Sequence, residues 1–204
     1  MANDNFRLRG QTVLADGFTR LSRFEFELRR RDGTWQRMDR EVFERGHGVC
    51  CLLYDPETGT VVLTRQFRVA VEIAGDDGMM IEAPAGHLDG ATPRERMQAE
   101  LEEETGYRIS DLYPVGNFYM TPGSVSAYQR LYLGRYSAAD RVAPGGGLRE
   151  EGEDIAVLHL PLTEALDMVA DGRIQDGKTV ILLQALALRL ARGEGAFGAP
   201  GRQA

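Results

Sequence analysis

Cysteine is scarce in this chain of 204 residues, which contains only two. They are adjacent, at Cys50 and Cys51, inside an apolar run. A disulfide framework or a structural zinc site needs several cysteines or histidines at characteristic spacings. The sequence therefore argues against both, and we expect the two thiols on a buried strand.

Long apolar runs and excess positive charge are missing as well. No stretch approaches the ~18 apolar residues of a membrane-spanning helix, and the polar N-terminus lacks the apolar core of a signal peptide. Lys and Arg number 24 against 31 Asp and Glu, which gives a net charge of −7. A general binder of nucleic acid or of an anionic membrane needs a basic surface. We therefore expect neither nucleic acid nor membrane as a partner, and a cytoplasmic location.

The strongest chemical signal lies in residues 82–106, where a glycine-containing loop leads into a short helix with four glutamates. At roughly 100° per residue, Glu103 and Glu104 fall about 60° and 40° to either side of Glu100, whereas Glu102 points the opposite way. Three carboxylates that share one helical turn repel one another. A divalent cation such as Mg²⁺ or Mn²⁺ would compensate them, because carboxylate oxygens suit such ions. The alternative is a solvated acidic helix face.

The ends of this helix are also marked in the sequence. Thr92 is a candidate N-cap, Pro93 follows at the first helical position, and Glu95 completes a capping box. Gly106 is placed to end the helix in the left-handed conformation. The acidic cluster thus lies at the negative end of the helix dipole, where a cation would stabilise it.

The glycine, aliphatic and acidic positions of this segment resemble the Nudix box, G-x5-E-x7-R-E-U-x-E-E-x-G-U, in which U is aliphatic. The matching residues are Gly86, Glu100, Leu101, Glu103, Glu104 and Gly106. Further short segments occur in the order seen in the ADP-ribose and GDP-mannose pyrophosphatase branch of that family. They are 66–68 (QFR), 82–86 (EAPAG), 119–123 (YMTPG), 145–147 (GGG), 151–155 (EGEDI) and 176–179 (DGKT). The similarity extends over roughly residues 19–192 and is greatest to the GDP-mannose hydrolases.

The box departs from its pattern in three ways. The spacing from Gly86 to Glu100 is one residue shorter, the first glutamate of the pattern would fall at Ala91 or Thr92, and Ala99 replaces the arginine that helps hold the box glutamates. Outside the box, Ala127 stands where related enzymes often carry an acidic residue. Arg96 lies four residues before Glu100 on the same helix face and offers a substitute for that arginine. The metal-binding face is intact, but the losses put catalytic efficiency in question.

The resemblance implies a Mg²⁺ cofactor, which Mn²⁺ can replace. It also implies roles for individual residues. The metal ligands would be Glu100, Glu104, the backbone carbonyl of Ala85 and Glu153. Glu103 would assist, and Glu151 would be the general base. The reverse assignment of the two loop acids stays open, as does a solvated acidic loop.

Substrate contacts are implied at two further positions. Arg68 is the candidate phosphate or sugar contact, since a guanidinium matches phosphate oxygens bidentately. Glu82 would bind the ribose or base of the substrate, or brace the loop. Lys178, at the start of the last helix, and His87, inside the box loop, are read as structural and incidental.

The expected fold is α/β (α+β), a Nudix α/β/α sandwich with a mixed sheet. An N-terminal antiparallel β-hairpin over residues 24–28 and 35–43 would precede it, after a loosely ordered first dozen residues. We expect residues 1–45 to form this β-element, which by resemblance serves dimerisation, residues 46–192 the Nudix domain and residues 193–204 a flexible tail. Strands are expected at 49–54, 60–66, 79–82, 107–119, 128–136 and 155–160, helices at 93–105, 163–170 and 178–191, and loops at 72–78 and 137–153.

The sequence thus predicts an enzyme, a metal-dependent hydrolase of the pyrophosphate bond in a nucleoside diphosphate sugar. ADP-ribose and GDP-mannose are the leading substrates, and a homodimer is the expected assembly. The losses in the box motivate an alternative, a catalytically weakened Nudix-fold module that binds or senses a nucleotide sugar. A third reading is a purely structural dimerising protein with a solvated acidic helix.

Overall fold

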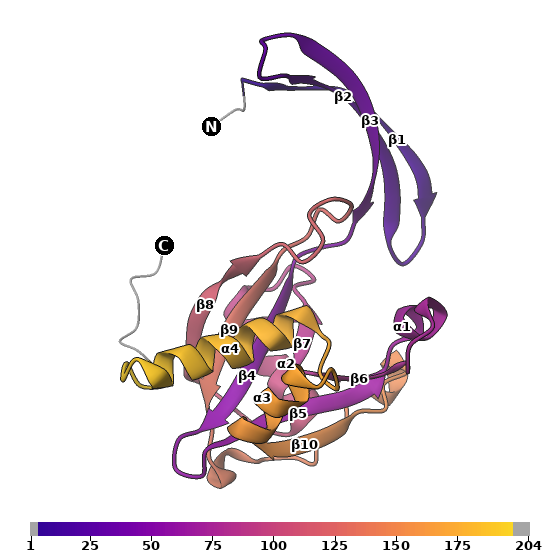
Figure 1. Ribbon diagram of the computed structural model, residues 1–204. Coiled ribbons are helices and arrows are strands. Elements are labelled where there is room, and N and C mark those ends of the chain that lie inside the picture. Colours follow the sequence, from indigo (N-terminus) through magenta and orange to yellow (C-terminus); the bar gives the residue numbers. More distant parts are fainter. Residues whose placement is uncertain (1–3, 198–204) are drawn as a thin grey trace. The chain divides into compact units, whose positions relative to one another are not determined.

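The computed structural model of the chain describes residues 4–197, which form two compact units (Figure 1). The N-terminal unit contains residues up to 46 together with residues 119–128, and the main unit contains residues 47–118 and those from 129 onward. The division after residue 46 lies next to the expected one. The sequence did not indicate that residues 119–128 join the N-terminal unit. They do so by pairing with the end of a strand, since Phe43 N donates to Ser124 O at 2.8 Å.

The N-terminal unit is a three-stranded antiparallel sheet in the order β1-β2-β3. Its strands are β1 (Phe6–Asp16), β2 (Arg20–Arg29) and β3 (Trp35–Glu44). The predicted hairpin corresponds to β2 and β3, but the expectation of a loosely ordered first dozen residues is wrong. Residues 6–16 pair with β2 along their length. Most of β1 is exposed, so it lacks the apolar alternation that reveals a half-buried strand.

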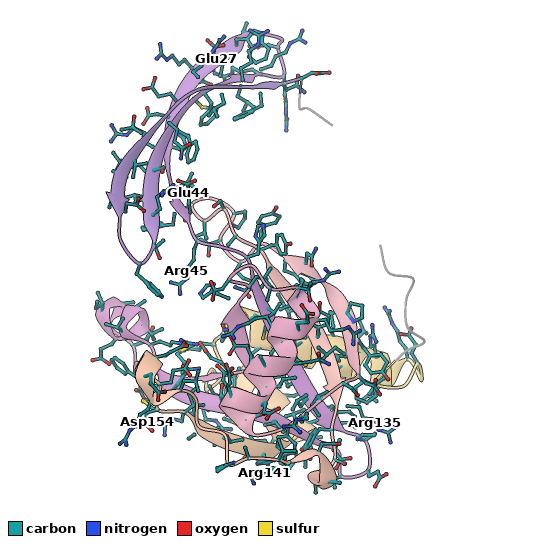
Figure 2. The ribbon with its side chains drawn as sticks, turned by 180° about the vertical axis from the view of Figure 1, so that it is seen from behind. Glu27, Glu44, Arg45, Arg135, Arg141 and Asp154 are labelled. Atoms are coloured by element: carbon teal, nitrogen blue, oxygen red, sulfur yellow. The ribbon has the colours of Figure 1, made fainter. Side chains whose placement is uncertain are left out.

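Charged side chains link the strands of this sheet across its surface. Arg9 Nη2 lies 2.6 Å from Glu27 Oε2, and Arg37 Nη2 lies 2.6 Å from Glu25 Oε2. Glu27 and Glu44 lie near opposite ends of the sheet (Figure 2). Such exposed pairs contribute little stability. The register of the three strands is therefore set mainly by the main-chain hydrogen bonds between them.

The main unit is built on a seven-stranded mixed sheet with the order β10-β5-β4-β9-β8, where β6 pairs with β5 and β7 with β4. Strands β4 and β9 are parallel, and the other pairs are antiparallel. The strands are β4 (Gly48–Asp55), β5 (Thr60–Phe67), β6 (Met79–Glu82), β7 (Ala85–His87), β8 (Leu112–Phe118), β9 (Gln129–Arg135) and β10 (Ala156–Pro161). The expected strand at 107–119 begins later, at Leu112.

Helices cover both faces of this sheet. They are α2 (Pro93–Glu100), which continues as a π-helical turn over Leu101–Thr105, and on the other face α3 (Leu162–Ala170) and α4 (Gly177–Ala191). A short exposed helix, α1 (Val69–Ala74), replaces part of the loop expected at 72–78. It was missed because it buries no side chain and therefore has no apolar stripe. None of the helices formed by residues 4–197 combines the length and the apolar character that crossing a membrane takes.

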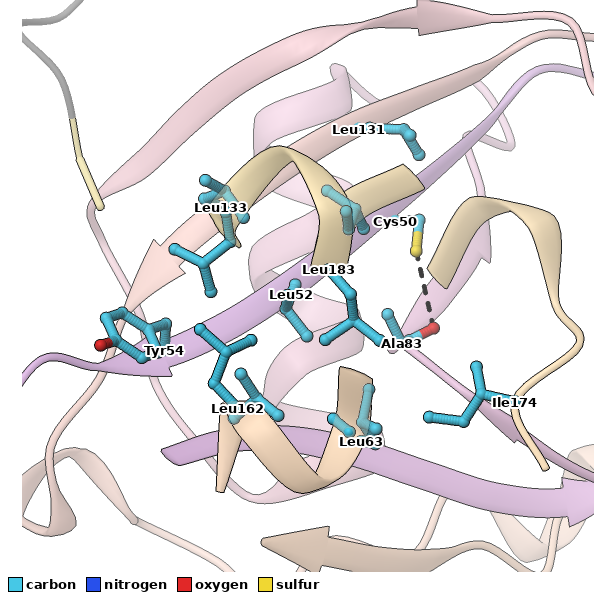
Figure 3. Close-up of a cluster of buried hydrophobic side chains, with 14 of the residues drawn as sticks. Cys50, Leu52, Tyr54, Leu63, Ala83, Leu131, Leu133, Leu162, Ile174 and Leu183 are labelled. Carbon is cyan, nitrogen blue, oxygen red and sulfur yellow. Dashed lines mark hydrogen bonds between the residues drawn. The ribbon is translucent and has the colours of Figure 1, made fainter. Parts of the chain in front are cut away.

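Strand β4 explains why the sequence shows a continuous apolar run at residues 49–54. Alternate residues point to two different cores, so the whole strand is buried. Cys51 contacts the core under α2, whereas Cys50 contacts the core under α3 and α4. Figure 3 shows the second core, with Leu162 of α3 and Leu183 of α4 packed over Leu52. The α/β/α sandwich predicted from the sequence is confirmed, and both thiols are free and buried.

The C-terminal segment begins on the core. Ala196 is buried, and the ring centroid of Phe197 lies 4.9 Å from that of Tyr113. The flexible tail expected from residue 193 is therefore packed where the structure describes it, because an aromatic side chain follows the Gly-rich turn. Residues 198–204 lie outside the described part of the chain.

Candidate active site

Helix α2 begins and ends where the sequence predicts. The hydroxyl of Thr92 accepts from Glu95 N and donates to the Glu95 carboxylate, so Thr92 is the N-cap, and Glu95 binds its hydroxyl in place of the backbone N–H that a capping box uses. Gly106 ends the π-helical turn in the left-handed conformation, with φ of 78°. Single π-helical turns are rare and occur frequently at functional sites. Here the turn carries three of the four glutamates.

The π-helical turn directs the glutamates to different environments. Glu100 and Glu104 are buried, with 5% and 2% of their surface exposed, and Glu103 is partly exposed. Glu102 points away, as the helical spacing predicts, and accepts two hydrogen bonds from the exposed Arg108 at 2.8 and 2.9 Å. The helix therefore presents two buried carboxylates on the side that faces β7.

The loop before the helix meets these two carboxylates. Ala85 N donates to Glu104 Oε2 at 3.1 Å. A Cβ atom on Gly86 would lie only 1.5 Å from Glu100 Oε1, so the carboxylate rests directly on the glycine backbone. Any side chain at that position would displace it. The glycine of the box is thus required by close packing.

Burial makes the two carboxylates poor acids. Burial, opposed by Arg96 and reinforced by Glu103, raises the pKa of Glu100 from 4.5 to about 7. Burial and the charge of Glu100 raise the pKa of Glu104 to about 8. The charge of Glu153 contributes to both shifts, so this carboxylate faces the same space. Two buried acids with raised pKa values are typical of functional sites and favour a bound cation.

The loop at 137–153 docks on the end of the glutamate helix. Gly146 N donates to Glu104 O at 2.9 Å, and Gly147 N donates to Glu103 O at 3.1 Å. Glu153 Oε2 accepts from Leu148 N at 2.8 Å and would collide with a Cβ atom on Gly147. The loop therefore brings the carboxylate of Glu153 to the site.

Glu151 is placed differently from Glu153. It ends a short helical turn, Arg149–Glu151, and is exposed. Its side chain makes no hydrogen bond or ion pair with the other residues that the structure describes. Of the two acids predicted on this loop, only Glu153 is brought to the buried glutamates.

A second charged cluster lies at the ends of β5 and β6. Arg68 donates to the buried Glu82 through Nη2 at 2.6 Å and through Nε at 3.1 Å. Lys178 Nζ lies 3.6 Å from Glu82 Oε1 and 2.8 Å from Asp176 Oδ1. The charge of Arg68 lowers the pKa of Glu104, which places the cluster near the metal candidates.

The contacts in this charged cluster show what Glu82 and Lys178 bind in the folded protein. Glu82 accepts from one cation and faces another, so its carboxylate braces Arg68 and Lys178. Burial alone would lower the pKa of Lys178, but the charges of Asp176 and Glu82 raise it. The sequence indicated a structural role for Lys178 but not its ion pairs with Glu82 and Asp176. The only sign of them in the sequence was the 176–179 segment, one of the segments that carry the resemblance.

The donor set fits a hard divalent cation of the Mg²⁺ type. Within residues 4–197, no group of three or more His, Cys, Asp or Glu side chains lies so that it could hold a metal ion by itself. Mg²⁺ does not need three such side chains, because it keeps several waters and takes one or two carboxylates plus phosphate oxygens of the substrate. Glu100 and Glu104 supply two carboxylates, and Glu153 is near.

Comparison with known proteins agrees with this geometry. Residues 5–43 match the family described as the GDP-mannose pyrophosphatase NudK N-terminal domain, and residues 44–183 match the NUDIX domain. A GDP-mannose pyrophosphatase of Klebsiella pneumoniae is 45% identical over 85% of this chain and 87% of its own. The protein of that name from Cronobacter sakazakii is 44% identical over 91% of this chain and 96% of its own.

A solved structure described as an ADP compounds hydrolase has the same fold. The TM-score is 0.72, and the alignment covers 96% of this chain and 99% of the other. At 17% identity, this likeness concerns the fold alone. The domain matches and the curated relatives go further, because they cover most of the chain at high identity. The chain belongs to the Nudix hydrolase family, in the group that carries the NudK-type N-terminal domain.

Proposed function

We propose that this Nudix hydrolase cleaves the pyrophosphate bond of GDP-mannose and releases GMP and mannose 1-phosphate. The observation that carries the proposal is the pair of buried carboxylates, Glu100 and Glu104, packed against the Ala85–Gly86 backbone. The names of the curated relatives favour GDP-mannose over ADP-ribose as substrate. Nudix hydrolases generally use divalent metal ions, and the oxygen donors here suit Mg²⁺.

In this proposal, different residues bind the metal ion and the phosphate groups of the substrate. Glu100, Glu104, Glu153 and the carbonyl of Ala85 would hold Mg²⁺. When bound, Mg²⁺ neutralises phosphate charge that would otherwise repel the attacking water. Arg68, which Glu82 holds by a hydrogen bond, would bind a phosphate of the substrate.

A general base must remove a proton from water as its oxygen bonds to phosphorus and the bridging P–O bond breaks. With Glu153 assigned to the metal, Glu103 and Glu151 are the candidates, and the reverse assignment of the two loop acids would make Glu153 the base. Glu103 is beside Glu100 and partly exposed, whereas Glu151 would have to approach with its loop. The geometry favours Glu103.

We further propose that the N-terminal unit pairs with a second copy of the chain. Ser22 is its one buried residue among those described, and seven large apolar side chains between residues 6 and 43 are exposed. They are Phe6, Leu8, Val13, Leu14, Phe18, Leu28 and Phe43. A sheet with so little buried apolar surface needs a partner surface. Location in the cytoplasm stays a prediction from the sequence.

Phosphate release tests the enzymatic proposal. GDP-mannose and ADP-ribose are supplied separately with Mg²⁺ and a phosphatase, which attacks the monoester products but not the intact substrates. Glu104→Gln should abolish turnover, and Glu102→Gln, on the outer face of the same turn, should leave it unchanged. Preference for ADP-ribose would reassign the substrate. Absence of turnover with a wide panel of nucleotide sugars would favour the binding module, which the losses at Ala99 and Ala127 motivate.

A further inference from the structure

Arg96 extends its guanidinium group into the acidic cluster from one helical turn before Glu100. Its Nη2 lies 2.5 Å from Glu100 Oε1, and its Nη1 lies 3.7 Å from Glu103 Oε2. The Arg96 side chain is 24% exposed and that of Glu100 is 7% exposed. The Nε atom is buried and has no hydrogen-bond partner among the described residues. The two carboxylates therefore determine where the guanidinium lies.

This ion pair differs from the ordinary surface pair that Glu102, on the π-helical turn, forms with Arg108, which follows the helix. Arg108 and Glu102 form the ordinary kind, with 68% and 37% of their side chains exposed. The carboxylate of Glu100 instead lies between the guanidinium of Arg96 and the backbone of Gly86. These two contacts restrict its rotation. The ion pair itself is made through Oε1 of Glu100.

The sequence shows what this contact replaces. Ala99 stands where the Nudix pattern has arginine, immediately before Glu100. An alanine side chain cannot reach either carboxylate. Residue 96 lies on the same helix face as residue 100, so an arginine there reaches the carboxylates from the preceding turn.

We propose that Arg96 is a positioning residue that has taken over the role of the missing box arginine, holding Glu100 in the orientation that binds the divalent cation and keeping Glu103 beside it. The inference rests on the proposed metal-dependent hydrolysis. It adds a residue that the family pattern does not mark, and it accounts for an intact acidic face in a box that has lost its arginine.

The charge of Arg96 and its positioning role predict opposite changes in the affinity for the divalent cation when Arg96 is removed. Loss of a positive charge beside a cation site would, by electrostatics alone, tighten cation binding. Loss of a side chain that orients a ligand weakens it, typically by about 10- to 100-fold. The sign of the change in affinity therefore separates the two.

Mn²⁺ binding, measured by isothermal titration or by the loss of the free-ion EPR signal, needs no nucleotide and no turnover. We expect Arg96→Ala to weaken Mn²⁺ binding by about tenfold or more. Arg96→Lys should lose nearly as much, because an ammonium group cannot span both carboxylates. Arg108→Ala, which removes the exposed ion pair with Glu102, should bind Mn²⁺ as the unsubstituted protein does. In turnover, kcat should fall in Arg96→Ala with little change in KM.

A rescue variant tests the replacement itself. Arg96→Ala combined with Ala99→Arg returns the arginine to the position of the pattern and should recover most of the lost affinity; no recovery would overturn the replacement. Equal or tighter Mn²⁺ binding by Arg96→Ala or, if that variant does not fold, by Arg96→Lys would overturn the positioning role. Absence of Mn²⁺ binding by the unsubstituted protein would overturn this inference and the proposed function together, whereas unchanged binding in the variants would overturn this inference alone.

Discussion

Two buried carboxylates dominate the electrostatics of this protein at the scale of single residues. Burial, together with repulsion from neighbouring glutamates, raises the pKa of Glu100 to about 7 and that of Glu104 to about 8. In the unfolded chain, both would titrate near the ordinary value of 4.5. The folded protein therefore binds more protons than the unfolded chain between these values, and its stability depends on pH and on cations.

We expect the unfolding free energy of the metal-free protein to fall as pH rises from about 4.5 to about 8. Below this window both states hold the proton, so the stabilising contribution is fully present. Above the folded pKa it is lost, at a cost of a few kcal/mol. Mg²⁺ should therefore raise the melting temperature more at about pH 8.5 than at about pH 5.

Thermal unfolding with Mg²⁺ and with a chelator checks this dependence. Glu104→Gln should flatten the pH dependence and remove most of the Mg²⁺ response. Glu102→Gln is the control, because Arg108 lowers the pKa of Glu102 and no raised pKa is lost. Identical pH profiles for Glu104→Gln and the unsubstituted protein would contradict the prediction.

Gly86 supplies a second prediction at this scale. In Gly86→Ala the new methyl group would meet Glu100 Oε1 at 1.5 Å, so the carboxylate must leave its place on the loop. We expect Mn²⁺ affinity to fall about tenfold or more, with kcat falling in parallel. Gly10→Ala, where a Cβ atom meets nothing within 4 Å, should change neither. Full Mn²⁺ affinity in Gly86→Ala would show that the box glycine is not needed for ligand placement.

At the scale of elements, the loop at residues 137–153 is bound to the π-helical turn that follows α2. The loop is tied by backbone hydrogen bonds to the carbonyls of Glu103 and Glu104, so it carries Glu153 to the site without further closure. Glu151 stays on an exposed turn. The three acids should therefore respond differently to neutralisation.

We expect Glu153→Gln to weaken Mn²⁺ binding, because its charge acts on both buried glutamates. Glu103→Gln should lower kcat by about 100-fold or more, as expected for loss of a general base. Glu151→Gln should have the smallest effect. Steady-state kinetics with GDP-mannose, together with Mn²⁺ titration, separates the three. A larger loss of kcat in Glu151→Gln than in Glu103→Gln would mean that the loop moves to place Glu151 as the base.

Sequence reasoning succeeded for elements whose signals are local. Helix α2 was predicted because its cap, first-turn proline and terminal glycine all lie within fifteen residues of the chain. Strand β4 was predicted because burial on both faces leaves a continuous apolar run. Strand β1 and helix α1 were missed because neither buries an apolar face. In these two cases, hydrophobic periodicity carries no information.

The site was predicted as far as local spacing allows. Helical periodicity grouped Glu100 with Glu104, and the structure buries both. The contacts of Glu82 with Arg68 and Lys178 join three separate elements of the main unit. One sequence contains no signal for such pairing. The sequence therefore left Glu82 open between binding substrate and bracing the loop, and the structure adds its contacts with Arg68 and Lys178.

At the scale of the whole molecule, the exposed apolar side chains of the N-terminal sheet call for a partner surface. On a monomer, replacing an exposed apolar residue such as Leu8, which is 54% exposed, by a charged one changes stability by only about 0.5 kcal/mol or less. In a dimer interface, the same change would bury an unpaired charge and oppose association. Leu8→Asp therefore distinguishes the two assemblies.

We expect the protein to be a dimer by light scattering coupled to size exclusion, and Leu8→Asp to shift it towards monomer at micromolar concentration. Arg31→Glu, a change of charge at an exposed position beyond β2, should leave the dimer intact. Because Glu100, Glu104 and Arg96 all belong to the main unit, monomeric Leu8→Asp should keep its affinity for Mn²⁺. A monomeric unsubstituted protein, or a dimer unaffected by Leu8→Asp, would show that the exposed apolar side chains of this sheet serve another surface. Loss of Mn²⁺ binding on dissociation would instead mean that the metal site depends on the second copy.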